Sequence, residues 1–181
     1  MSTLKVSTIS PLGTDATKTI TLGESGGTLG IASGAKTSGF GKIGQVIQTS
    51  LTDNNQTLNT TTFTDLTNLT VSITPTSTSS KILITSAIQV ALDDSSGARA
   101  YMRLLRGTDV IQTLAGITDN NVSSQGENYV FNFLDSPNST SSQTYKVQAK
   151  STNSSLDIRF VYNTNDSIST VTTLTAMEVL A

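Results

Sequence analysis

Several residue types on which most enzymes and metalloproteins depend are missing from this chain. Its 181 residues include no cysteine, no histidine and no tryptophan. These absences exclude a thiol nucleophile, an imidazole base, a Cys/His metal site and a disulfide framework. We therefore expect a protein that is not an enzyme and that needs no cofactor.

Charged residues are also scarce. They make up 13% of the chain, against a usual share of about 25%, and the net charge of −2 and pI near 4.9 reveal no basic excess. Nucleic acids and anionic membranes are held by clustered Lys and Arg, so we predict no nucleic-acid partner. No apolar run reaches the roughly 18 residues of a membrane span, which predicts no membrane insertion.

Serine and threonine take the place of charge at the surface. The chain has 25 Ser and 32 Thr, while hydrophobic residues make up 35%. Ser and Thr in this density disfavour helix interiors, and no window shows the apolar spacing of a helix. Residues 1–10 alternate apolar and polar side chains instead of forming an apolar block, so we expect no signal peptide.

Residues 1–40 differ in composition from the rest of the chain. They hold most of the glycines and no aromatic residue before Phe40, so they cannot build a core alone. Any strands in this segment would be short, and short strands become stable only when they pair with others. The segment therefore favours an extended β-rich shaft or virion anchor over the alternative of a flexible Gly/Ser linker. The candidate anchor residues are the alternating aliphatics Leu4, Val6, Ile9, Ile20 and Leu22.

Residues 41–181 read as a separate head domain of short strands. Strict alternation over 145–150 places Tyr145, Val147 and Ala149 toward a core, and residues 156–162 repeat the pattern. Between Ile43 and Leu180 we count about ten such segments separated by turn residues, with residues 56–63 and 69–73 among them. This number predicts an all-β protein, either an antiparallel two-sheet sandwich or a jelly roll.

Two predicted strands carry apolar residues on both faces. In residues 81–92 this pattern indicates a strand that is covered on both sides. In residues 171–180 it suggests that one face meets the core and the other a neighbouring subunit. The candidate trimer-interface residues are Val171, Leu174, Met177, Val179 and Leu180.

A few polar clusters could hold a ligand, although each is also typical of a turn or a solvated face. Asp93-Asp94, residues 119–121 and residues 163–166 offer oxygen atoms that could bind a cation or simply form turns. Arg99 and Arg103 share one strand face, where they could contact a partner or an anionic glycan.

Polar loops at one end of the predicted head are candidates for receptor binding. If strands alternate in direction and both ends of the head lie beside the anchor, loops 75–80, 107–109, 135–142 and 163–168 lie far from it. Short polar side chains suit hydrogen bonding to sugar hydroxyls, although no aromatic residue in these loops could stack on a sugar. The candidate receptor residues are Thr76, Ser77, Thr108, Asp109, Asn138, Ser139, Asn163, Asn165 and Asp166.

Short motifs along the chain resemble virion fibre proteins of tailed bacteriophages. Those in the amino-terminal part span residues 4–9, 20–26 and 31–34. Those in the head span residues 79–84, 103–107, 133–137 and 144–149. The resemblance implies a homotrimer whose tip is a jelly roll like that of tumour necrosis factor and complement globular heads, and it brings no catalytic residues.

On this resemblance we expect a structural virion protein made in the host cytoplasm, a trimeric tail fibre with a host-receptor-binding tip. Its partners would be two further copies of itself, other virion proteins through residues 1–40, and a host-surface glycan or protein. One alternative is a capsid decoration or cement protein that stabilises the shell. A more remote alternative is a polysaccharide-degrading tailspike, which needs two carboxylates about 5–9.5 Å apart in a cleft.

Overall fold

The computed structural model describes residues 43–52, 56–92, 99–118, 126–155, 157–160 and 171–180. The chain divides between Phe40 and Gly41 into two units, and all the described residues belong to the second. The candidate anchor residues lie outside the described ranges. They are Leu4, Val6, Ile9, Ile20 and Leu22.

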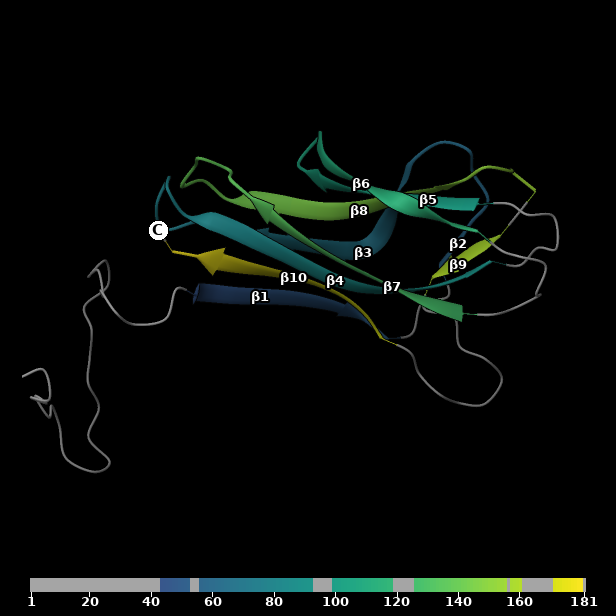
Figure 1. Ribbon diagram of the computed structural model, residues 1–181, viewed down its shortest axis with the longest axis horizontal. Coiled ribbons are helices and arrows are strands. Elements are labelled where there is room, and N and C mark those ends of the chain that lie inside the picture. The colour runs from purple at the N-terminus through teal and green to yellow at the C-terminus, as the bar shows by residue number, and fades with distance from the viewer. Residues whose placement is uncertain are drawn as a thin grey trace, which may run out of the picture. The chain divides into compact units, whose positions relative to one another are not determined.

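The described residues form ten strands, which agrees with the number expected from the sequence (Figure 1). In chain order they are β1 (Ile43–Leu51), β2 (Gln56–Leu58), β3 (Thr64–Ile73), β4 (Lys81–Leu92), β5 (Arg99–Arg106), β6 (Asp109–Thr118), β7 (Gly126–Asp135), β8 (Gln143–Ser151), β9 (Ile158–Phe160) and β10 (Thr172–Val179).

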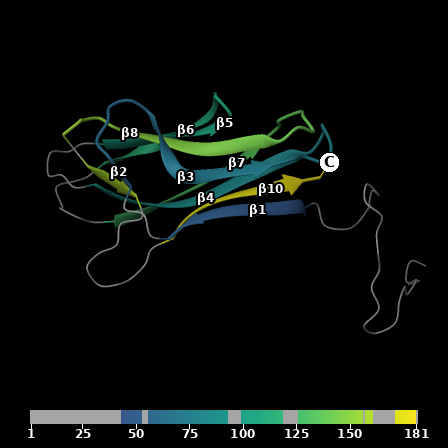
Figure 2. The same cartoon turned by 180° about the vertical axis from the view of Figure 1, so that it is seen from behind.

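The strands make two antiparallel sheets that pack as a jelly-roll-like sandwich, so the predicted fold class is confirmed (Figures 1 and 2). Sheet A holds β1, β10, β4, β9 and β2 in that order, and β7 pairs with the other side of β4. Sheet B has the order β3-β8-β5-β6. Every strand pair is antiparallel.

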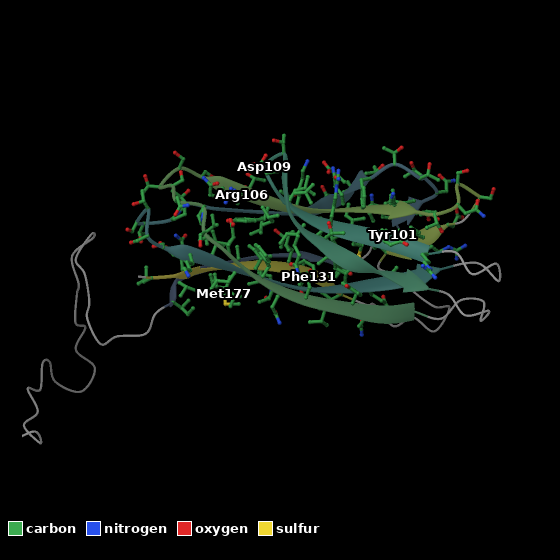
Figure 3. The ribbon with its side chains drawn as sticks, turned by 45° about the horizontal axis from the view of Figure 1, so that its top comes forward. Tyr101, Arg106, Asp109, Phe131 and Met177 are labelled. Atoms are coloured by element: carbon green, nitrogen blue, oxygen red, sulfur yellow. The ribbon has the colours of Figure 1, made fainter. Side chains whose placement is uncertain are left out.

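Alternation along the strands places one face of each sheet in a shared core. The predicted inward residues of β8, Tyr145, Val147 and Ala149, are fully buried, and Figure 3 shows Phe131 of β7 between the two layers. On the central strand β4 the even-numbered residues face this core. They include Ile82, Ile84, Ile88 and Val90.

Two predicted strand boundaries were wrong, one because the chain turns early and the other because a bulge breaks the alternation. The expected strand 56–63 ends at Leu58, since the chain then turns and the Thr60 hydroxyl accepts a bond from the Thr62 N–H at 3.1 Å. The expected strand 69–73 begins earlier, at Thr64. A bulge between Asp65 and Thr70, with Asn68 at a φ of 63°, interrupts the alternation that sequence reasoning relied on.

The topology overturns the expected placement of three polar loops, 75–80, 107–109 and 135–142, whereas loop 163–168 lies outside the described residues. Ile43 pairs with Val179, Val179 with Lys81, and Ile82 with Asp135. The loops after β3 and β7 therefore lie at the same end as the start of β1 and the end of β10. Gly107 joins them, because its N–H donates to the Thr144 carbonyl at 2.8 Å. These loops mark the end at which the chain enters the sandwich, not the end away from it.

Candidate functional site

Neither a metal-binding cluster of acidic side chains nor a membrane-spanning helix is found in the part of the chain that the structure describes. No group of three or more acidic side chains comes close enough together there to hold a metal ion. The same residues contain no helix that is long and apolar enough to cross a membrane. The features that remain are the outer faces of the two sheets and two buried carboxylates.

A row of apolar side chains crosses the outer side of sheet A, next to a polar row of Gln48, Thr175, Thr85 and Asn132. Met177 pairs with Val46 on one side and with Leu83 on the other, and Leu83 pairs in turn with Leu134. Directly paired residues project to the same side of a sheet, so these four side chains form one row across β1, β10, β4 and β7. We define the apolar face as this row together with Ala87, Val130 and Val179.

Several side chains of the apolar face are open to solvent. Val130 is 65% exposed, Val46 57% and Leu134 48%, while Leu83 and Met177 are half-buried. Figure 3 shows Met177 on the outer side of sheet A, away from sheet B. An apolar row that crosses four strands is larger than the single exposed apolar residues that soluble proteins usually carry, and it marks an interaction surface.

The candidate trimer-interface residues separate into two groups in the structure. Met177 and Val179 belong to the apolar face, and Val171 is 49% exposed just before β10. Leu174 is fully buried in the chain's own core, so it does not reach a surface that another subunit could contact. Leu180 is half-buried beyond the end of β10.

A cationic face covers the outer side of sheet B. We define it by Arg99, Tyr101, Arg103, Lys146 and Lys150, which project away from the core on β5 and β8, and by Phe63, which precedes β3. Tyr101, labelled in Figure 3, pairs directly with Lys150, and Arg103 pairs with Gln148. The Arg103 guanidinium carbon lies 4.1 Å from the centroid of the Phe63 ring, and Lys150 Nζ lies 4.9 Å from the same centroid.

Asp65 supplies negative charge beside this cationic face. Its Oδ2 is 2.8 Å from Lys146 Nζ, and its Oδ1 accepts a hydrogen bond of 2.6 Å from Gln148 Nε2. The Lys146 ammonium holds the pKa of the Asp65 carboxyl below its usual value of 3.8. Both oxygens of this carboxylate are therefore already engaged.

A buried carboxylate joins three segments at the chain-entry end. Glu178 is fully buried. Its Oε1 accepts bonds from the Thr76 N–H at 2.6 Å and the Thr76 hydroxyl at 2.7 Å, and its Oε2 accepts one from Gln45 Nε2 at 2.8 Å. Burial alone would raise the pKa of Glu178, but these donors together hold it below its usual value of 4.5.

A second buried carboxylate connects the two sheets. Arg106 Nη1 lies 3.1 and 2.9 Å from the two carboxylate oxygens of Asp135, and the Tyr145 hydroxyl donates to Oδ2 at 2.7 Å. Burial, and next the bond to Asp135, raise the pKa of Tyr145. Because Asp135 ends β7 of sheet A while Arg106 and Tyr145 lie in sheet B, this network fixes the sheets to each other at the chain-entry end.

The candidate receptor residues do not form a single cluster of free side chains. Thr76 is committed to Glu178, and the Ser139 hydroxyl accepts a bond from the Ser141 N–H at 3.0 Å. Thr108, Asp109 and Asn138 are exposed, whereas Ser77 is half-buried. Three further candidates, Asn163, Asn165 and Asp166, lie outside the described residues, as do Asp93-Asp94 and residues 119–121.

Sequence reasoning found only part of each face. It placed Arg99 and Arg103 together, and it placed Met177 with Val179. It missed Phe63 and Lys150 on the cationic face, because strand partners far apart in the sequence leave no local signal. Val46 and Leu134 were missed on the apolar face for the same reason, although an apolar residue opposite the core side of a predicted strand was a usable clue.

Comparisons with known proteins returned only distant structural likenesses. No family model and no curated protein matches the chain. The structure of infectious bursal disease virus Gx strain is similar over 76% of this chain and 37% of its own, with 14% identity and a TM-score of 0.38. The crystal structure of the VP2 subviral particle of the same virus covers 76% of this chain and 38% of its own, with 12% identity and a TM-score of 0.36. The chain thus spans less than half of either neighbour.

Proposed function

We propose that this protein is a non-enzymatic structural component of a tailed-phage virion, a homotrimeric fibre whose β-sandwich head serves in host recognition. The observation that carries the proposal is the apolar face of sheet A. The number of subunits and the virion setting come from the sequence motifs that resemble phage fibre proteins. Two sequence expectations, no enzymatic activity and no cofactor, belong to the same proposal.

The apolar face supports self-association for a physical reason. Transfer of exposed apolar surface out of water contributes roughly 25 cal/mol per Å², and interface cores are depleted in charged residues. The row Val46–Met177–Leu83–Leu134 carries no charge. Its two ends lie on strands β1 and β7, and a second copy could approach sheet A from either strand. A fibre that exists only as an oligomer would keep such a face covered.

The oligomeric state tests this proposal. We expect the full chain to scatter light as a species of three times 19.0 kDa, and Val46→Asp to give single chains or insoluble protein because the carboxylate would be buried without a partner. Val110→Asp is the matched control, since Val110 is 45% exposed on β6 and lies outside the apolar face. A Val46→Asp variant that remains a soluble trimer would contradict this use of the face.

The location on the particle separates fibre from capsid decoration. An antibody against residues 43–181 should label the tail in electron micrographs if the protein reads a host surface. Label over the capsid would instead favour the decoration alternative, in which residues 1–40 fit between capsid subunits. The second candidate keeps the same head and the same apolar face, so only the location distinguishes the two.

A further inference from the structure

The described positive charge is concentrated on one side of the molecule. Seven Lys and Arg residues lie in the described ranges, and four of them, Arg99, Arg103, Lys146 and Lys150, project from the cationic face of sheet B. This concentration contrasts with a chain whose net charge is −2. The face therefore has a local excess of positive charge on a surface that is otherwise mostly Ser and Thr.

Two of these cations lie beside the same aromatic ring. The Arg103 guanidinium and the Lys150 ammonium both lie within 5 Å of the Phe63 ring centroid, at 4.1 and 4.9 Å, and Lys150 Nζ is also 5.8 Å from the centroid of Tyr101. The two charged groups are therefore at most about 9 Å apart, close to the screening length of about 8 Å at physiological ionic strength, so salt screens their mutual repulsion only partly. An anion that bridged them would relieve this repulsion.

Among the described residues no carboxylate forms an ion pair with Arg103 or Lys150, although the charge of Asp65 acts on Arg103 at longer range. The ion pairs found there are Arg106–Asp135 and Lys146–Asp65, and both Asp65 oxygens are already bonded. Arg103 uses Nε to donate to Gln148 Oε1 at 2.8 Å. This bond fixes the guanidinium plane, whose Nη edge is suited to a bidentate contact with a carboxylate.

We propose that the cationic face is a binding site for a carboxylated polysaccharide, a chain of sugars that carry uronic-acid groups. Arg103 and Lys150 would bind the carboxylates, Arg99 would extend the positive charge along the chain, and Tyr101 would pack against the apolar face of a sugar ring. This inference deepens the proposed host-recognition role and rests on it for its biological setting. The binding itself is a property of the head domain.

The position of the face fits this role better than the polar loops do. It lies on the outer side of sheet B, whereas the apolar face proposed to join subunits lies on the outer side of sheet A, so the sandwich separates the two. Repeated weak sites on a trimer gain affinity through multivalency, by roughly 10²–10⁴ overall. A polymer with a carboxylate on every sugar is the kind of ligand that uses such repetition.

Titration calorimetry tests the site. It compares the affinity of the full-length protein for polygalacturonate oligosaccharides with its affinity for neutral dextran oligosaccharides of equal length. We expect binding to polygalacturonate that weakens with added salt, and no binding to dextran. Arg103→Gln and Lys150→Gln should each weaken it by about tenfold or more, since a charge-assisted contact is lost. Lys81→Gln is the matched control, because Lys81 is exposed on sheet A, and its affinity should be unchanged.

A second pair of variants guards against a merely structural effect. Arg103→Lys keeps the charge but loses the planar fork, so it should weaken binding less than Arg103→Gln while the thermal midpoint and the trimer mass of both stay near those of the parent protein. Lack of polygalacturonate binding by the parent protein, equal binding of dextran, or tighter binding of single-stranded DNA would each overturn the site. If the trimer is found on particles but does not bind polygalacturonate, the fibre proposal stands and the binding site is overturned. If the protein binds polygalacturonate but is absent from particles, only the fibre proposal is overturned.

Discussion

At the scale of single residues, the buried carboxylate of Glu178 connects separate segments of the head. Glu178 has no cationic partner among the described residues, yet hydrogen bonds from Gln45 and Thr76 keep it ionised. Through them β10 holds both β1 and the loop after β3. A residue that looks like an ordinary polar position in a Thr-rich strand therefore organises the end at which the chain enters.

Protonation or neutralisation of Glu178 should destabilise the head. Because its folded pKa lies below 4.5, its contribution is fully present above that pH and is lost as the pH falls through the folded pKa. In Glu178→Gln an amide would place a donor against one of the existing donors, so the free energy of unfolding at pH 7 should fall by about 1–3 kcal/mol. Its further loss on acidification should also be smaller than in the parent protein.

Urea denaturation at pH 7 and pH 4, at a fixed protein concentration and followed by circular dichroism, measures both effects. Asp65→Asn is the control, since this carboxylate is half exposed in its pair with Lys146 and such pairs contribute at most about 1 kcal/mol. Equal losses in the two variants would show that burial of Glu178 does not matter for stability.

At the scale of elements, alternation and turn chemistry define the strands. The β5–β6 connection is a tight turn in which Gly107 has a φ of +58° and its N–H reaches the Thr144 carbonyl. Figure 3 shows Arg106 and Asp109 side by side at the base of this turn. The turn therefore holds the hairpin against the start of β8.

Substitution of Gly107 should cost stability through the backbone alone. A Cβ at this position would meet nothing within 4 Å, so Gly107→Ala introduces no clash but forces alanine into the left-handed region. We expect a loss of about 1 kcal/mol in the free energy of unfolding. Thr108→Ala, at an exposed position of the same turn, should change it by less than about 0.5 kcal/mol, and an equal effect of both would rule out the conformational explanation.

At the scale of the whole molecule, the two outer faces divide the proposed tasks. The apolar face of sheet A suits association with further copies, and the cationic face of sheet B suits an acidic ligand. The polar loops 75–80, 107–109 and 135–142 lie at the end where residue 43 enters the sandwich, whereas both faces lie along its sides.

Removal of the first 41 residues tests the anchor at this scale. The fragment 42–181 keeps both sheets and the apolar face, so we expect it to remain trimeric by light scattering but to be missing from particles assembled in its presence. The full chain, added in the same way, is the control. Recovery of the fragment on particles at the level of the full chain would show that residues 1–40 do not attach the protein.

The sequence by itself determined the strand periodicity, the all-β class and the inward side of regularly alternating strands such as β8, because alternation is a local property that a two-residue repeat records directly. Only the tertiary structure decided which strands are neighbours, and hence that Val46 meets Met177 and that Phe63 meets Arg103. It also decided at which end the loops lie, since antiparallel partners can be arranged in many orders with the same local pattern. Surfaces assembled from distant strands therefore depend on long-range pairing, which local periodicity does not encode.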